Sequence, residues 1–346
     1  MHNLKEKRIA IIGAGIGGMT AAVALANKGI DVSVFEQAPE LSEVGAGITI
    51  TPNATKGLIH LGLDEEIKKV GMAHTQQGVR HFKTGDMIVP LERGEKMLEK
   101  YGAYQLQAHR ADVHNVLIDK FAFNHADSIY VDHQLTDLKE KAETVELIFS
   151  NGQIYEFDFV IGADGNRSVV RKIIIGDDDP KFAGYVAWRG LVPTKDLSEN
   201  DFDECGSSAF IAPGRVFARY LVRNAELYNY VAFLATEQWA EEGWSIPSEV
   251  DIVLDIFSDY NQQVKNIISA TPPEELFKWG IFTREPVFKW STDKITLLGD
   301  AAHPIEPFMG QGASLAIEDG VVLGRIIGCL LYTSDAADEG LGVDLG

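Results

Sequence analysis

Apolar and polar positions change their spacing along residues 7–36 in an order that predicts a strand, a helix and a second strand. Residues 9–12 form an apolar run of strand length, and residues 30–35 form another. An alanine-rich stretch lies between them and begins directly after Gly18. This order is typical of the βαβ unit that opens a doubly wound parallel sheet.

The same patterns predict helices and hairpins along the rest of the chain. Up to residue 175, they predict a helix at 54–61, a hairpin at 75–92 with its turn at Thr84–Asp86, a helix that begins at His109, and a hairpin at 145–150 and 153–161 around Asn151 and Gly152. Beyond it, they predict strands from Ala183 to Leu234, helical residues 250–270, a buried strand at 294–300 and a helix from Ala313 to about Leu331. The strands from Ala183 to Leu234 follow one another without an intervening helix, so we expect an α/β protein with an inserted sheet-rich domain.

The turn between the first strand and helix is rich in glycine. Gly13 permits a tight turn, Gly15 lets backbone N–H groups approach a pyrophosphate, and Gly18 lets the helix pack closely on the strand. Glu36 ends the second strand, where a carboxylate accepts hydrogen bonds from ribose hydroxyls. The segment therefore predicts a dinucleotide site that uses the helix N-terminus, with NAD and FAD both open at this point. The alternative is a glycine turn in a fold that has lost its ligand.

Composition narrows the class of protein. The chain has 346 residues, of which 45% are hydrophobic and 24% charged, and this is enough to bury a large core. A formal net charge of -20 disfavours nucleic acid and anionic membrane as partners. The two cysteines, Cys205 and Cys329, have no spacing suited to a metal or a disulfide framework. This cysteine usage predicts no structural metal. No apolar run is long enough to span a membrane, and together with the cysteine usage this leads us to expect a cytoplasmic protein.

Two further glycine and acid pairs follow apolar strands. Asp164 ends the strand within residues 157–164, and Asp300 ends the strand at 294–300. Ligands of doubly wound sheets bind at the carboxyl ends of the strands. Together with the N-terminal fingerprint, these motifs make the chain resemble the single-component FAD-dependent aromatic hydroxylases of the p-hydroxybenzoate hydroxylase fold. The likeness runs from about Arg8 to about Leu331.

The resemblance implies how the chain divides and which residues hold FAD. It implies an FAD-binding domain at 1–72, 103–175 and 283–331, with a substrate domain at 73–102 and 176–282. Small residues around Gly47 suggest close approach to a ligand. The implied FAD-binding residues are Gly13, Gly15, Gly18, Glu36, Gly47, Arg110, Asp164, Asp300, Gly310, Gln311 and Gly312.

Candidate catalytic residues follow from the same resemblance. Pro307 is expected beside the flavin ring, and His303 is next to the flavin by motif, although a structural role suits it better. Tyr220 is the candidate polar group of the substrate pocket, against the alternative of an ordinary half-buried sheet tyrosine. Several relatives carry a histidine four residues before this tyrosine, where the chain has Val216, and a related member has histidine at Phe308. The usual base is therefore missing.

The family chemistry implies an enzyme that uses NAD(P)H and O2 to hydroxylate a small aromatic or heteroaromatic ring through a flavin hydroperoxide. The ring is expected to carry a carboxylate and an activating hydroxyl or amino group, with Arg189, Arg215 and Arg219 as candidate partners of the carboxylate. The motifs Gly184–Val192 and Ala301–Ala313 look most like the salicylate, 3-hydroxybenzoate and 6-hydroxynicotinate hydroxylase branch. A dehydrogenase or oxidase of the same fold, or a non-catalytic FAD-bound module, are the alternatives. A homodimer is compatible with the sequence.

The composition changes after about Leu331. Residues 332–346 contain no basic residue and little apolar periodicity, whereas family members continue from this helix with further arginine-rich turns. We therefore expect a truncated chain whose residues 332–346 form a disordered, non-native tail.

Overall fold

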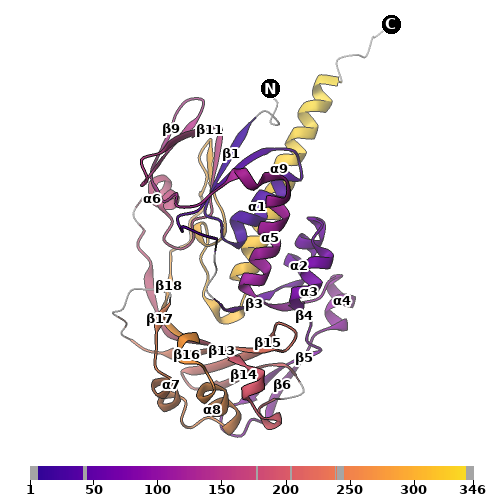
Figure 1. Ribbon diagram of the computed structural model, residues 1–346, viewed down its shortest axis with the longest axis vertical. Coiled ribbons are helices and arrows are strands. Elements are labelled where there is room, and N and C mark those ends of the chain that lie inside the picture. Colours follow the sequence, from indigo (N-terminus) through magenta and orange to yellow (C-terminus); the bar gives the residue numbers. More distant parts are fainter. Residues whose placement is uncertain are drawn as a thin grey trace.

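A five-stranded parallel sheet forms the centre of one half of the molecule (Figure 1). The computed structural model describes residues 7–41, 45–176, 178–202, 205–237, 239 and 245–339, with side chains up to Cys329. The strand order is β19-β12-β1-β2-β8, and every neighbouring pair is parallel. The strands are β1 (Arg8–Ile12), β2 (Asp31–Phe35), β8 (Ile129–Tyr130), β12 (Phe159–Gly162) and β19 (Ile295–Leu297).

Three helices pack together beside this sheet: α1 (Ile16–Ala26), α5 (Arg110–His125) and α9 (Gly312–Glu339). The side chains at their shared core include Met19, Leu117 and Ile317, all of which are fully buried. A Cβ on Gly320 of α9 would lie only 2.8 Å from the Ala21 nitrogen of α1. Glycine at this position therefore lets α9 lie close against α1.

Two three-stranded sheets and three short helices complete this half. The antiparallel sheet β11-β10-β9 lies at the top of Figure 1, and the sheet β3-β7-β4 lies toward the other half of the molecule. Their strands are β9 (Leu135–Glu140), β10 (Val145–Phe149), β11 (Ile154–Phe157), β3 (Gly47–Ile50), β4 (Gly71–Met72) and β7 (Leu106–His109). The helices are α2 (Pro52–His60), α3 (Asp64–Val70) and α6 (Val169–Ile175).

An eight-stranded sheet dominates the other half, with the order β17-β18-β13-β16-β15-β14-β5-β6. Helices α7 (Val250–Ile256) and α8 (Gln262–Ser269) cover its lower face in Figure 1, where the buried core includes Phe217, Tyr228 and Tyr230. Its strands are β5 (Gln76–His81), β6 (Met87–Glu92), β13 (Lys181–Pro193), β14 (Ser207–Ala212), β15 (Arg215–Val222), β16 (Leu227–Ala235), β17 (Ile246–Pro247) and β18 (Leu276–Thr283), with α4 (Glu95–Tyr101) after β6. Short 3-10 helices occur at Ala126–Ser128, Thr194–Asp196, Glu199–Asp201, Pro273–Glu275, Gly299–Ala301 (η6) and Pro307–Met309 (η7).

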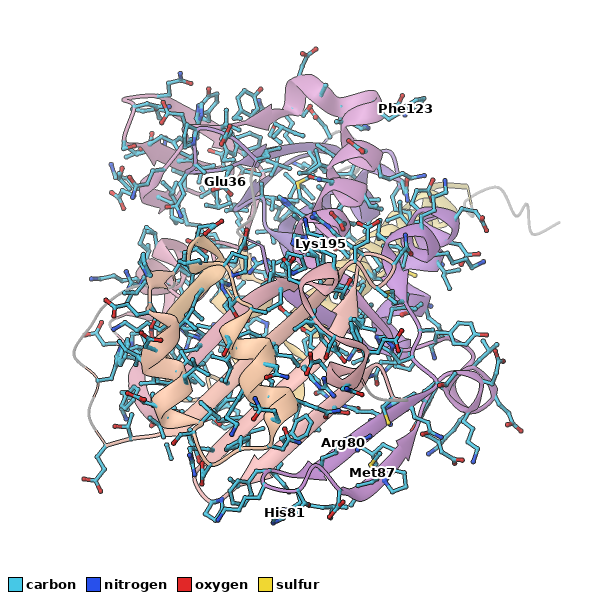
Figure 2. The ribbon with its side chains drawn as sticks, turned by 60° about the horizontal axis from the view of Figure 1, so that its bottom comes forward. Glu36, Arg80, His81, Met87, Phe123 and Lys195 are labelled. Atoms are coloured by element: carbon cyan, nitrogen blue, oxygen red, sulfur yellow. The ribbon has the colours of Figure 1, made fainter. Side chains whose placement is uncertain are left out.

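The view in Figure 2 separates the two halves. Glu36 lies in the half that contains the parallel sheet, and Arg80, His81 and Met87 lie on the β5–β6 hairpin at the edge of the large sheet. The parallel sheet and the inserted sheet-rich unit confirm the predicted α/β fold class. Among the described residues, no helix is both long and apolar enough to cross a lipid bilayer.

Three predicted elements differ from the structure. The predicted strand 153–161 divides at Asp158 into β11 and β12, which belong to different sheets. Asp158 accepts a hydrogen bond from the Arg8 nitrogen at 2.9 Å and forms an ion pair with Lys7. These contacts hold the corner between the two strands. The predicted helix 250–270 divides into α7 and α8.

The third difference concerns the predicted tail. Helix α9 was expected to end at about Leu331, but its backbone remains helical to Glu339. Residues 332–339, expected as part of a disordered tail, therefore continue the helix, and residues 340–346 lie outside the described part of the chain.

Candidate active site

The three fingerprint glycines have different surroundings. Gly13 has a φ of +101°, and a Cβ there would lie 2.4 Å from the Ala163 oxygen of the neighbouring strand connection. A Cβ on Gly18 would lie 2.0 Å from the Gly13 oxygen, so glycine is needed for close packing of α1 on β1. A Cβ on Gly15 would meet no atom within 4 Å. Gly15 therefore faces open space at the start of α1.

The start of α1 can hold an anion. Gly15 is its N-cap residue, and no side chain caps the helix or places an acid in its first turn. The first N–H groups of a helix carry positive potential and need acceptors. Open space beside such N–H groups fits the pyrophosphate of a dinucleotide.

Glu36 lies directly beside this turn. Its carboxylate accepts hydrogen bonds from the Ala14 nitrogen at 2.9 Å and the Ala38 nitrogen at 3.0 Å. These two bonds fix the side chain at the carboxyl end of β2, next to the glycine turn. The arrangement fits an acid that accepts hydrogen bonds from an adenosine ribose.

Asp164 and Asp300 follow neighbouring parallel strands, because β12 pairs with β19. Asp164 accepts hydrogen bonds from the Ser168 hydroxyl at 2.5 Å and the Val169 nitrogen at 2.7 Å, and it therefore caps the start of α6. Burial raises the pKa of Asp164, and these hydrogen bonds act against that rise. The Asp164 carboxylate is thus held by the protein chain itself.

Asp300 has a more open position on η6. Its side chain is exposed, yet desolvation by the surrounding protein raises its pKa, while the charges of Arg110 and His303 act in the opposite direction. An ideal Cβ on Gly312, at the start of α9, would lie 3.9 Å from Asp300 Oδ1. The structure thus brings Arg110, Asp300 and Gly312 into one region, as expected for residues around a single cofactor.

His303 is held against α9. Its Nε2 lies 2.6 Å from Asp319 Oδ2, and this same oxygen accepts a hydrogen bond from the Gly299 nitrogen at 2.9 Å. The hydrogen bond with Asp319 raises the pKa of His303, although burial opposes this. The geometry favours the structural role for His303, since its ring fastens the Asp300 loop to α9.

The segment from Pro307 to Gly312 connects this loop to α9. Pro307 begins η7 and is half-buried, and Gln311 is exposed. Gly310 has a φ of +61°, and a Cβ there would lie 3.3 Å from Thr49 Oγ1 of β3. The left-handed backbone at Gly310 therefore lets the segment turn beside β3 before α9 begins.

β3 also contacts the large sheet. A Cβ on Gly47 would lie 2.5 Å from Tyr220 Cε2 of β15 and 2.6 Å from Asn229 Cγ of β16. The Gly47 nitrogen donates a hydrogen bond to Asn229 Oδ1 at 2.7 Å. Gly47 and Tyr220 were predicted separately as a cofactor residue and a pocket residue, and the structure brings them together.

The sheet face around Tyr220 is mostly apolar. Val216, Ala218 and Tyr220 share this face of β15, while Phe217 and Arg219 point to the side covered by α7 and α8. The ring centre of Phe308, in η7, lies 4.9 Å from the ring centres of both Tyr185 and Phe233. An apolar surface therefore lies where the Phe308 loop meets the large sheet.

Only one of the three candidate arginines lies on this face. Arg189 is 5% exposed, and its guanidinium lies over the ring of Phe277. Arg215 forms a double hydrogen bond with Asp259, and Arg219 lies on the opposite face. The expectation that any of the three could meet a substrate carboxylate is therefore corrected to Arg189.

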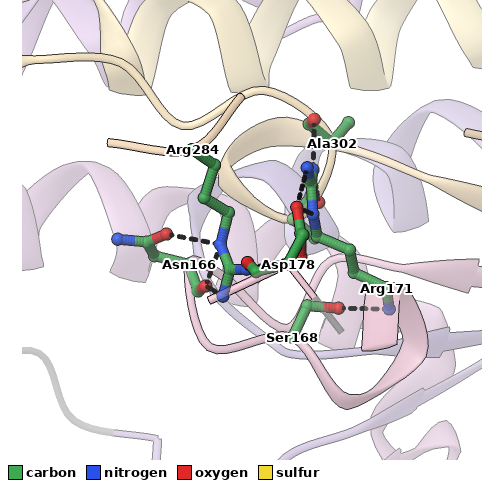
Figure 3. A network of polar contacts seen from close by, with 7 residues as sticks. Asn166, Ser168, Arg171, Asp178, Arg284 and Ala302 are labelled. Atoms are coloured by element: carbon green, nitrogen blue, oxygen red, sulfur yellow. Dashed lines mark hydrogen bonds and ion pairs between the residues drawn. The ribbon is translucent and has the colours of Figure 1, made fainter. Parts of the chain in front are cut away.

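A polar network that the sequence did not reveal joins the two halves (Figure 3). Asp178 accepts hydrogen bonds from Arg171 Nε at 2.8 Å and from Arg284 Nη1 at 2.6 Å. Arg171 also donates to the Ala302 oxygen at 2.7 Å, and Arg284 donates to the Asn166 oxygen at 2.6 Å. Two of the chain crossings between the halves, after α6 and after β18, are thereby fastened to the loops that carry Asp164 and Asp300.

The fold and this site define the class of the protein: it is a flavoprotein whose cofactor is FAD. Residues 6–342 match the model of the FAD binding domain family. The chain therefore belongs to this family, and it is an FAD-dependent monooxygenase of the aromatic hydroxylase type.

Two curated relatives illustrate the similarity. The 6-hydroxynicotinate 3-monooxygenase of Pseudomonas fluorescens is 36% identical over 328 residues, which cover 93% of this chain and 83% of the relative. The 3-hydroxybenzoate 6-hydroxylase of Klebsiella oxytoca is 32% identical over 324 residues, which cover 93% and 80%. Both names describe monooxygenation of a ring.

Solved structures agree with the fold. HpxO of Klebsiella pneumoniae, solved with FAD and uric acid, matches with a TM-score of 0.85 and 28% identity over 94% of this chain and 80% of that one. A salicylate hydroxylase in a substrate complex matches with a TM-score of 0.78 and 26% identity over 94% and 80%. The predicted aromatic hydroxylase fold and the choice of FAD over NAD as the resident cofactor are confirmed.

Proposed function

We propose that the protein hydroxylates a small, carboxylated aromatic or heteroaromatic ring, with NAD(P)H and O2 as co-substrates. The observation that carries the proposal is the contact of Gly47 on the cofactor side with Tyr220 on the large sheet. This contact puts a phenolic hydroxyl at the border between the cofactor loops and an apolar sheet face. A ring that stacks on such a face can present its polar group to Tyr220.

The bound FAD supplies hydride acceptance from NAD(P)H and the activation of oxygen. The chain itself has to bind the ring and exclude water, because water at the reacting centre diverts reduced oxygen to peroxide. Tyr185, Phe233 and Phe308 provide apolar surface for this purpose. Burial raises the pKa of Tyr220, so its hydroxyl stays protonated near neutral pH and donates a hydrogen bond to the ring substituent.

Arg189 is our candidate for the substrate carboxylate. It lies on β13, on the same sheet face as Tyr220, and its Nη2 donates to Ser245 Oγ at 2.8 Å. Its guanidinium lies 5.5 Å from the centre of the Phe277 ring and 5.7 Å from that of Trp279. A cation held over aromatic rings suits a carboxylated aromatic ligand. The names of the relatives, which include 6-hydroxynicotinate and 3-hydroxybenzoate, support a carboxylated ring.

The test is NAD(P)H oxidation by the holoenzyme in the presence of ring compounds. We expect oxidation to rise when 6-hydroxynicotinate or 3-hydroxybenzoate is added, with a hydroxylated product in step. Oxidation that forms only peroxide with every ring compound would instead support an oxidase. Absence of any NAD(P)H oxidation would favour a non-catalytic FAD-bound module.

A further inference from the structure

Asn229 has a buried side-chain amide whose oxygen is hydrogen-bonded and whose amino group is not. Its side chain is 1% exposed, and its Oδ1 accepts the hydrogen bond from the Gly47 nitrogen at 2.7 Å. A backbone N–H only donates, so the amide oxygen must face Gly47 and the amino group must point away from it. The described residues provide no hydrogen-bond partner for this amino group, Nδ2. A buried donor without an acceptor is destabilising, so a further molecule is expected to supply one.

Tyr220 lies directly across from Asn229 in the sheet, with both side chains on the junction face. An ideal Cβ on Gly47 would lie 2.8 Å from Tyr220 Oη and 2.6 Å from Asn229 Cγ. The hydroxyl and the amide therefore meet at the same point of the cofactor strand. Since burial raises the pKa of Tyr220, both groups are donors near neutral pH.

Among the described residues, no carboxylate or imidazole forms a hydrogen bond with Tyr220 or Asn229. Desolvation alone changes the pKa of Tyr220, without a contribution from a charged neighbour. His109 on β7 has a lowered pKa because of burial and the nearby Arg223, and its Nδ1 faces that arginine at 3.3 Å. The surrounding elements also carry other charged or titratable groups, among them Arg110, Asp112, Lys181, Tyr185, Arg189, Arg215, Arg219, Tyr228, Tyr230, Asp300 and His303.

We propose that Asn229 Nδ2 and Tyr220 Oη together bind the activating ring oxygen of the substrate as a hydrogen-bond acceptor. The enzyme therefore selects rings whose oxygen is already a phenolate or a carbonyl when the ring binds. This inference rests on the proposed function and names the form of its substrate. The proton of a phenolic ligand goes to solvent before binding, and none of the described side chains around this pair takes it.

The selection predicts how ligand binding depends on pH. We expect the affinity of the holoenzyme for a halogenated 3-hydroxybenzoate to rise about tenfold per pH unit below the ligand's own hydroxyl pKa, where the phenolate fraction rises by that factor. A second halogenated ligand with a lower hydroxyl pKa should shift the profile by the same number of pH units. Benzoate, which lacks the ring oxygen, should bind weakly at every pH. Dissociation constants are measured from the change in flavin absorbance.

Variants separate the donor from the structural bond. Asn229→Asp keeps an oxygen for the Gly47 nitrogen and replaces the amino group by a second oxygen. We expect it to weaken phenolate binding by about tenfold or more, increasingly so as pH rises, while FAD content is kept. Tyr220→Phe should weaken binding of the same ligand without a change in pH dependence.

Matched controls exist on the other side of the sheet. Asn261→Asp changes an asparagine that caps α8, where aspartate is an equally good cap. Tyr230→Phe removes a hydroxyl that contacts Thr271 on the face opposite the cofactor. Neither control should alter the dissociation constant of the ligand.

Each contrary result has a distinct meaning. The inference is overturned if Asn229→Asp leaves ligand affinity unchanged. In that case, a fall in FAD content would assign the Asn229 amide to the stability of the fold. A shift of the ligand-free flavin spectrum would instead assign the amide to an oxygen of FAD. The inference is also overturned if the pH midpoint stays fixed when the ligand pKa changes, or if no ring hydroxyl compound binds. Ligands that bind as expected without being hydroxylated would refute the proposed function alone.

Discussion

Arg223 and Asp112 join the two halves of the molecule by a double hydrogen bond. Arg223 Nε donates to Asp112 Oδ2 at 2.9 Å, and Nη2 donates to Oδ1 at 2.7 Å. Arg223 belongs to the hairpin between β15 and β16, and Asp112 belongs to the first turn of α5, two residues after Arg110. The ion pair therefore fixes the hairpin of the substrate sheet against the helix that begins at the cofactor site.

This ion pair should contribute modestly to stability. The Arg223 side chain is 40% exposed, so solvent screens its attraction to Asp112. A double-mutant cycle with Arg223→Gln, Asp112→Asn and the double variant should therefore give a coupling free energy on the order of 1 kcal/mol. Although burial opposes it, the hydrogen bond from Arg223 lowers the pKa of Asp112. The contribution is therefore present above the unfolded pKa of aspartate, about 3.9, and is lost as pH falls through the lower folded value. Urea unfolding at several pH values would measure it, and a coupling independent of pH would contradict this account.

His303 should produce the opposite pH dependence. The hydrogen bond with Asp319 raises the pKa of His303, so the protonated ring stabilises the fold. This contribution is complete below the unfolded pKa of histidine, about 6.5, and is lost as pH rises through the higher folded value. The melting temperature of the protein should exceed that of His303→Asn most at about pH 6, with the gap narrowing by about pH 9. A gap that widens with pH would rule out a protonated His303.

The cofactor side of the molecule was predictable because its motifs are local. The turn from Gly13 to Gly18 depends on a strand and a helix that adjoin it in the sequence, and Glu36 follows the very next strand. Asp164 and Asp300 were predicted at the same sheet edge because each directly follows an apolar strand. In such cases, the hydrophobic pattern predicts the strands and helices, and the rule that ligands bind at the carboxyl ends of parallel strands predicts the site.

The substrate side depends on register, which the sequence pattern does not contain. Asn229 became a candidate only because β16 pairs with β15 so that Asn229 lies opposite Tyr220, and because Gly47 of β3 lies against both side chains. Alternation along β15 separated Val216 and Tyr220 from Arg215 and Arg219. It did not say which face meets the cofactor, because helices cover one face and the cofactor loops the other. The break at Asp158 was missed for a similar reason, since one apolar run can serve two sheets.

Asp178 should be important for stability. Its carboxylate forms ion pairs with Arg171, whose side chain is 1% exposed, and with Arg284, whose side chain is 9% exposed. Asp178→Asn would leave these buried cations without their anion, so we expect a loss of about 3 kcal/mol in the free energy of unfolding. Asp259→Asn is the matched control, because Asp259 also pairs with an arginine but is 41% exposed. Its loss should stay below about 1 kcal/mol, and equal losses in the two variants would refute the distinction.

Gly15 and Gly18 should respond differently to the same substitution. Gly15 has φ −67° and ψ 179°, and its Cβ would meet nothing within 4 Å, so Gly15→Val should fold normally. The valine side chain would occupy the space expected for the pyrophosphate, and FAD binding should be lost. Gly18→Val should instead prevent folding, because its Cβ would lie 2.0 Å from the Gly13 oxygen. Flavin absorbance and circular dichroism distinguish these outcomes, and a fully yellow Gly15→Val protein would refute the cofactor assignment.

Tyr220 should affect turnover without loss of the cofactor. Its hydroxyl lies at the border of the cofactor strand, and its phenyl ring already packs against Gly47. Tyr220→Phe keeps this packing and removes one donor to the ring oxygen, so FAD content and melting temperature should stay within a few degrees of the parent values. Hydroxylation should fall by roughly 10² or more, which is the scale of a positioned polar group in a closed site. NAD(P)H oxidation should fall less than product formation, because a badly held ring allows reduced oxygen to escape as peroxide. Product and peroxide are quantified in the same reaction, with Tyr230→Phe as the control. Unchanged product formation in Tyr220→Phe would remove Tyr220 from the mechanism.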